Sequence, residues 1–131
     1  MNKFTQVLWF QGPAIAWALA IFIQSSISYL NAPNLGFDWQ DKFYHAIEYA
    51  ILAFFIRRAL IYQPNLGVQR DAEWLTILIA SVYAISDEIH QYFVPGRSAD
   101  LSDVAADIIG SILVVLFYLV ARQLRQQGIS N

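Results

Sequence analysis

The chain has 131 residues, of which 57% are hydrophobic and 14% are charged, and its formal net charge is −2. This composition is too apolar for a soluble domain of this length, because a small domain has mostly surface to cover. Cys is absent, which excludes disulfides and thiolate metal sites, and the lack of a basic stripe or a phosphate-cradling Gly loop argues against nucleic-acid or nucleotide binding.

Four apolar stretches follow one another along the chain, at roughly 9–30, 43–62, 73–94 and 101–121. Each is close to the ~20 residues with which an α-helix crosses a bilayer, and none alternates with the period of two that barrel strands show. The first run continues to Ile27 without an A-x-A-like cleavage site, which favours a helix over a signal peptide. We therefore predict one domain (residues 1–131), an all-α polytopic membrane protein with four transmembrane helices in an antiparallel bundle.

The basic residues are distributed unevenly around these stretches. Only Lys42 and Arg97 fall on the side of the first and third connections. The others fall on the side of the termini and the middle connection: Lys3, Arg57, Arg58, Arg70, Arg122 and Arg125. The positive-inside rule then predicts a multi-pass chain with both termini in the cytoplasm.

The acidic residues show the opposite distribution. Only Asp71 and Glu73 fall on the inner side. Those toward the outer side are Asp38, Asp41, Glu48, Asp87, Glu88, Asp100, Asp103 and Asp107. Acidic residues contribute little to orientation, so this distribution indicates a use for carboxylates at the outer face.

Helical spacing predicts which of these charges share a face. Asp41, His45 and Glu48 fall on one stripe of the second stretch, and Asp87 and Gln91 are four residues apart in the third. In the fourth stretch, Asp100, Asp103 and Asp107 form another stripe. A charge at the centre of a transmembrane helix costs about 3 kcal/mol even on the most lenient scale. We therefore expect these side chains to converge on a polar pocket that opens to the outside.

Structural explanations also fit several of these residues. Asp100 and Asp103 suit the positive N-terminal end of a helix, and Pro95 and Gly96 suit a tight turn between two helices. His45 and His90 suit interior hydrogen-bonded positions. A network of polar side chains that only holds the helices together stays open as an alternative.

Two segments resemble the VanZ-like membrane proteins: "DKFYHAIEYAILAF" (41–54) and "SDEIHQYFVPGRSADLSDVAADIIGSIL" (86–113). The family pattern pairs D-K-x-x-H-x-x-x-Y with D-E-x-x-Q-x-x-x-P-G-R, followed by spaced Asp residues and a Gly in the last span. The matching positions are Asp41, Lys42, His45, Tyr49, Asp87, Glu88, Gln91, Pro95, Gly96, Arg97, Asp103 and Gly110. The resemblance implies an envelope protein in the cytoplasmic (inner) membrane of a bacterium. It also implies low-level resistance to the glycopeptide teicoplanin, which acts on cell-wall precursors outside the membrane.

Three functions fit these observations. The first is binding of an envelope lipid, cell-wall precursor or glycopeptide at the outer mouth, in contact with membrane lipids. The second is an intramembrane acid/base or metal-assisted enzyme that acts on an envelope lipid, with Asp87, Glu88 and His45 as catalytic candidates. The third is a proton- or cation-coupled transporter. No recognised metal-ligand spacing is present, so neither a metal nor a cofactor is expected.

The candidate ligand-binding residues are Asp41, Lys42, His45, Glu48, Tyr49, Asp87, Glu88, Gln91, Arg97, Asp100, Asp103 and Asp107, with Pro95 and Gly96 as turn residues. Arg97 is a special case, because it follows a tight turn beside many carboxylates. We predict that it pairs with Asp87, Asp100 or Asp103 in the empty site and turns to an anionic headgroup in the filled one.

Overall fold

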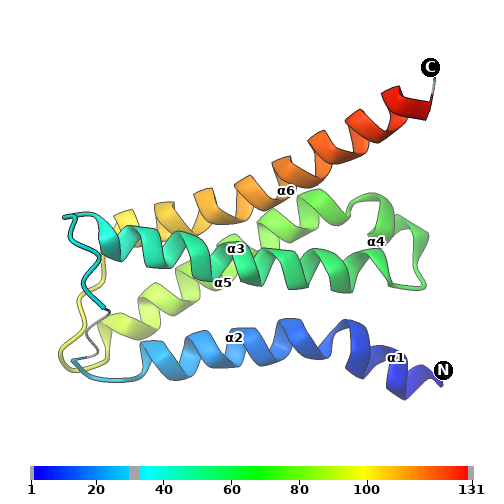
Figure 1. Cartoon of the computed structure of the whole chain (residues 1–131). Coiled ribbons are helices and arrows are strands. Elements are labelled where there is room, and N and C mark those ends of the chain that lie inside the picture. Colours follow the sequence, from blue (N-terminus) through cyan, green and yellow to red (C-terminus); the bar gives the residue numbers. More distant parts are fainter. Residues whose placement is uncertain (1, 30–32, 130–131) are drawn as a thin grey trace.

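The computed structural model describes residues 2–29 and 33–129, and all regular structure in those residues is helical (Figure 1). The helices are α1 (Lys3–Phe10), α2 (Gly12–Ser25), α3 (Gln40–Ile61), α4 (Leu66–Arg70), α5 (Ala72–Tyr92) and α6 (Leu101–Ile129). Consecutive long helices run in opposite directions. The segments 26–29, 33–39 and 93–100 lie at one end of the bundle, and α1, α4 and the C-terminal part of α6 lie at the other (Figure 1). The all-α prediction is confirmed.

The first apolar stretch, at roughly 9–30, contains the end of α1 and all of α2, and the chain bends between these two helices. Helices α1 and α2 meet at Gln11 with an angle of 49°. Pro13 occupies the first turn of α2, where its ring and missing N–H are incompatible with continuing the preceding helix. Helix α2 ends at Ser25, and the hydroxyls of Ser25 and Ser26 donate to the Phe22 carbonyl. The predicted end at residue 30 lies outside the described residues.

The other three predicted stretches correspond to α3, α5 and α6. Their boundaries agree within about three residues, except that α6 continues from the predicted end near residue 121 to Ile129. Helix α4 was not predicted. It begins because Asn65 accepts hydrogen bonds from the N–H groups of Gly67 and Val68, at 2.9 and 3.3 Å, and so caps its N-terminus.

Length and composition alone identify few membrane-crossing helices. Among the described residues, one helix, α6 over Leu101–Gly128, is long and apolar enough on its own, and the bent pair α1–α2 qualifies if it counts as one span. Helix α3 carries five charged residues among its 22, and α5 carries Glu73, Asp87 and Glu88. The predicted four-span arrangement is therefore not confirmed by helix composition.

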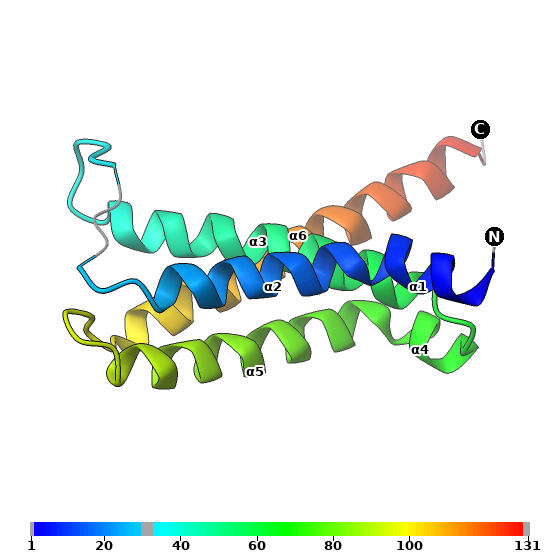
Figure 2. The ribbon, with the colours of Figure 1, turned by 90° about the horizontal axis from the view of Figure 1, so that it is seen from below.

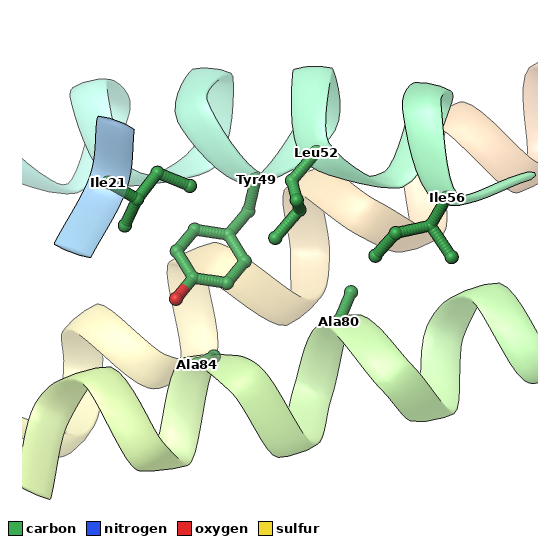
Figure 3. Packing of buried hydrophobic residues seen from close by; sticks show 6 residues of the cluster. All are labelled: Ile21, Tyr49, Leu52, Ile56, Ala80 and Ala84. Carbon is green, nitrogen blue, oxygen red and sulfur yellow. The ribbon is translucent and has the colours of Figure 1, made fainter. Parts of the chain in front are cut away.

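Small side chains allow α5 to approach α3. Every fourth residue of the buried face of α5, at positions 72, 76, 80 and 84, is Ala or Thr and is fully buried. Tyr49, Leu52 and Ile56 of α3 pack against this stripe together with Ile21 of α2 (Figure 3). Helix α2 lies over the line where α3 and α5 meet (Figure 2) and contacts both. Small residues at helix crossings favour close packing in this way.

Helices α3 and α6 run in the same direction and meet at Gly110. A Cβ at Gly110 would overlap the carbonyl oxygen of Ala46 and would lie only 2.8 Å from the carbonyl carbon. Only glycine therefore permits this approach. Asp107 and Asp103 lie about one and two turns before Gly110, so the close crossing places both carboxylates against the N-terminal half of α3.

Candidate functional site

A cavity of about 280 Å³ lies between α2, α3 and α5, at the end of the bundle that carries the segments 33–39 and 93–100. Its lining consists of Ile21, Gln24, Ser25, Pro33, Asp41, Tyr44, His45, Glu48, Asp87, Gln91 and Arg97. The predicted stripe of Asp41, His45 and Glu48 thus faces the same cavity as Asp87 and Gln91 from α5. We refer to this cavity as the outer pocket.

Asp87 is the lining residue with the most incomplete hydrogen bonding. Its side chain is buried, with the residue 6% exposed. The Gln91 amide donates to its Oδ2 at 3.1 Å, across one helical turn. Its Oδ1 has no hydrogen-bond partner among the described residues. A buried carboxylate oxygen without a hydrogen-bond donor costs free energy. A ligand N–H group that donates to Oδ1 would therefore gain binding free energy at this atom.

Glu48 is held in place from α2. The Gln24 amide donates to its carboxylate, and the Trp17 indole N–H donates to its backbone carbonyl at 2.9 Å. These two contacts fix α2 against α3 at the wall of the outer pocket. They also give Trp17 a position that no membrane-interface pattern in the sequence indicated.

Asp103 and Asp107 lie behind the outer pocket rather than in its lining. Asp107 is 1% exposed, and its Oδ1 lies 3.0 Å from His45 Nδ1. Because a carboxylate only accepts, Nδ1 carries the proton. Asp103 Oδ2 lies 3.9 Å from His45 Nε2, so the imidazole is flanked by carboxylates on both sides.

Lys42 forms ion pairs with three carboxylates. Its ammonium contacts Asp103 closely, and it lies 3.1 Å from Asp100 and 3.4 Å from Asp41. Two helices, α3 and α6, are joined by these ion pairs at the outer end. The lysine is therefore not free to bind an anionic ligand at the mouth.

Asp100 and Glu88 accept backbone hydrogen bonds at the start of α6. Asp100 precedes α6 and accepts from the Ser102 N–H at 2.8 Å. This hydrogen bond, with the nearby Lys42 ammonium, lowers the pKa of Asp100 to about 2, so it stays ionised at neutral pH. Glu88 accepts from the backbone N–H of Asp100 and does not line the outer pocket. It borders a separate apolar cavity between α5 and α6 instead.

Our prediction that Arg97 pairs with a carboxylate is wrong. Its guanidinium donates to the backbone carbonyls of Gln24 and Ile27, at 2.7 and 3.2 Å. Helix α2 ends at Ser25, and the last carbonyls of a helix have no partner within it, which makes them good acceptors for arginine. Arg97 thus ties the 93–100 segment to the end of α2 at the rim of the outer pocket.

The remaining predicted site residues have structural positions. Tyr49 is fully buried and points from α3 toward α5 (Figure 3); its hydroxyl has no partner among the described residues. Gly96 has φ of +79°, as a tight turn after Pro95 requires. A Cβ there would also overlap the ring of Tyr29.

One group of side chains could hold a metal ion. The ligand atoms of Asp41, His45 and Asp103 lie within 4.8 Å of one another. The Lys42 ammonium already contacts both of these carboxylates, so a cation at this position would compete with a built-in positive charge. The geometry therefore favours an ion-pair network here over a metal centre.

Sequence reasoning missed the contribution of α2 to the outer pocket. Gln24 and Ser25 both line it, and Tyr44 lines it from α3 while its hydroxyl donates to the Pro33 carbonyl at 3.0 Å. The polar run "QSS" at 24–26, inside an otherwise apolar stretch, was the signal available in the sequence.

The family model VanZ/LLP1 matches residues 4–122. The chain belongs to the VanZ/LLP1 family. No curated protein matches the chain, and no solved structure matches it. The family match spans every residue that lines the outer pocket and both segments on which the resemblance was based. The VanZ-like resemblance seen in the sequence is confirmed.

Proposed function

We propose that this VanZ/LLP1-family chain is a four-span membrane protein whose outer pocket faces away from the cytoplasm and binds an envelope molecule through a positively charged N–H group. An envelope lipid, a cell-wall precursor or a glycopeptide such as teicoplanin is the ligand, and its capture protects the envelope. The observation that carries the proposal is the buried, half-satisfied carboxylate of Asp87 in the wall of the outer pocket.

Helix lengths and exposed side chains support the membrane placement. Helices α3 and α5 contain 22 and 21 residues, which at ~1.5 Å per residue match a ~30 Å hydrocarbon core. Large apolar side chains are exposed along the outside of the long helices, including Leu113, Phe117 and Val120 on α6, far beyond what a soluble monomer exposes. The buried polar residues of α5 and α6 face the bundle interior. The excess of basic residues at the α1–α4 end supports placing that end in the cytoplasm.

The charges of the outer pocket favour a cationic ligand. Asp41, Glu48 and Asp87 line it. Among the described lining residues, Arg97 is the only Lys or Arg, and it is bound to backbone carbonyls. Lys42 is held by aspartates. A ligand ammonium would supply donors to Asp87 and offset the excess of negative charge. This proposal replaces the sequence-based expectation that Arg97 turns to an anionic headgroup in the filled site.

Asp87→Asn is expected to weaken binding of teicoplanin to the purified full chain by at least roughly tenfold, because a hydrogen bond to a charged group contributes about 1.5–3 kcal/mol. Glu88→Gln is the matched control. It changes the adjacent carboxylate by the same chemistry but lies outside the outer pocket, so its affinity should equal that of the parent. Binding is measured by titration in detergent. Equal affinity of parent and Asp87→Asn, or equal losses in both variants, contradicts the proposal.

A second candidate function is supported by the His45–Asp107 pair. An imidazole that lines a cavity and lies between two buried carboxylates, those of Asp107 and Asp103, is a group that can take part in proton transfer. This candidate is an acid/base enzyme acting on an envelope lipid. It differs from the binding function in requiring a chemically changed product, which mass spectrometry of lipid incubated with the purified chain would detect.

A further inference from the structure

A cavity that contains two arginines lies at the opposite end of the bundle from the outer pocket. Its volume is about 210 Å³, and it lies between the C-terminal end of α3 and α6, lined by Phe54, Arg57, Arg58, Ile61, Tyr62 and Tyr118. We refer to it as the inner cavity. It has room for a five-atom phosphate group, since one water molecule occupies ~30 Å³ in the liquid.

Arg58 is the first reason to assign a ligand to the inner cavity. Its guanidinium carbon lies 5.3 Å from the ring centre of Phe10 and 6.0 Å from that of Trp9. Phe10 in turn stacks on Tyr62, with ring centres 4.0 Å apart. Within the described residues Arg58 has no hydrogen bond or carboxylate partner. The aromatic rings therefore hold the guanidinium in place while its N–H donors stay free.

Arg57 supplies a second incomplete group in the same cavity. One terminal nitrogen donates to Glu73 at 2.8 Å, and the guanidinium carbon lies 3.9 Å from the ring centre of Tyr118. Its Nε–H is buried and has no partner among the described residues. A buried N–H without an acceptor is costly, and an anionic oxygen in the inner cavity would satisfy it.

Among the described residues, the acidic groups at this end of the molecule leave no further carboxylate for Arg57 or Arg58. Of its acidic residues in the described chain, Glu73 pairs with Arg57 and Asp71 pairs with Arg70. Arg58, Arg122 and Arg125 remain without a described carboxylate, so the end carries an excess of positive charge. An anion from outside the chain would therefore bind favourably.

We propose that the inner cavity binds the phosphate of an anionic membrane phospholipid, with Arg58 and the Nε–H of Arg57 as donors. Arginine suits phosphate because its planar donors match the phosphate oxygens. Exposed Trp9 and Tyr62 flank the site, as aromatic side chains do at the level of lipid headgroups. The assignment rests on the four-span placement proposed above but not on any ligand of the outer pocket.

The test measures the stabilisation of the purified full chain by added lipid, followed as thermal unfolding in a neutral detergent. Phosphatidylglycerol is the anionic probe, phosphatidylcholine the zwitterionic one, and inorganic phosphate the anion without a lipid. The half-maximal concentration should be about tenfold lower for phosphatidylglycerol than for phosphatidylcholine, and inorganic phosphate should have no effect at the same concentration. Equal responses of the unchanged chain to both lipids overturn the proposal without any variant.

Variants then locate the site. Arg58→Gln should abolish the preference for phosphatidylglycerol. Arg125→Gln, which removes one positive charge from α6 outside the inner cavity, should retain it. Loss in both variants would indicate a diffuse charge effect, and loss in neither would remove Arg58 from the site; either result overturns the assignment. Stabilisation by inorganic phosphate equal to that by phosphatidylglycerol would show a soluble anion as the ligand and overturn the phospholipid.

Discussion

Replacing Gly110 by Ala is expected to lower the free energy of unfolding by about 3 kcal/mol, at the upper end of overpacking costs. The new Cβ would overlap the Ala46 carbonyl oxygen and lie 2.9 Å from the Ala46 Cα. These are backbone atoms, which cannot rotate away as a side chain can. Helices α3 and α6 would have to separate, and the His45–Asp107 pair would separate with them. Thermal or denaturant unfolding of the purified chain in detergent measures the loss.

Gly128→Ala is the matched control for this prediction. It lies in the same helix, and nothing lies within 4 Å of its added Cβ. Alanine favours a helix over glycine by up to ~1 kcal/mol, so this variant should be as stable as the parent or slightly more stable. If Gly110→Ala unfolds at the same temperature as Gly128→Ala, the close crossing of α3 and α6 is incorrect.

Lys42→Met is expected to destabilise the chain by about 3 kcal/mol, because it removes one partner of a partly buried ion-pair network. Asp103 is only 4% exposed and would lose its cation, while Asp100 and Asp41 would lose their contacts with the same ammonium. Methionine keeps the length and apolar character of the lysine stem. The change in unfolding free energy is again measured in detergent at neutral pH.

Arg70→Met provides the comparison for an exposed pair. Arg70 and Asp71 lie 3.0 Å apart, but their side chains are 78% and 49% exposed. Exposed pairs contribute about 0–1 kcal/mol, so this variant should unfold close to the parent. Similar losses in Lys42→Met and Arg70→Met would mean that the Lys42 network is as weak as a surface pair.

The sequence predicted α3, α5 and α6 well because each consists of an apolar run whose ends carry turn-forming or charged residues. It also predicted that Asp41, His45 and Glu48 share a face, since residues three and four apart lie on one side of a helix. The same geometry turns successive residues by ~100°. Asp87 and Glu88 therefore had to face different neighbours. In the structure, Asp87 lines the outer pocket, whereas Glu88 accepts a hydrogen bond from the backbone N–H of Asp100, just before α6.

The partners of each charge could not be predicted, because they depend on contacts between helices. Arg97 binds α2 carbonyls only because α2 ends at Ser25 and the 93–100 segment passes beside that end. Lys42 reaches Asp100 and Asp103 only because Gly110 brings α6 close to α3. The bend at Gln11 could not be predicted either, because Pro13 can begin a new helix or kink a continuous one. The binding and catalytic roles of the outer-pocket residues stay predictions.

A single cysteine at Gln24 gives the most direct test of the central claim, that an acidic pocket opens to the outside of the cell. The chain has no Cys of its own, and Gln24 is an exposed residue of the pocket lining. In intact cells, Gln24→Cys should react with membrane-impermeant thiosulfonates, the cationic reagent at least roughly tenfold faster than the anionic one. Asn65→Cys, at the opposite end, should react only after the membrane is permeabilised. Labelling of Asn65→Cys but not Gln24→Cys in intact cells, or faster reaction of Gln24→Cys with the anionic reagent, would contradict the account.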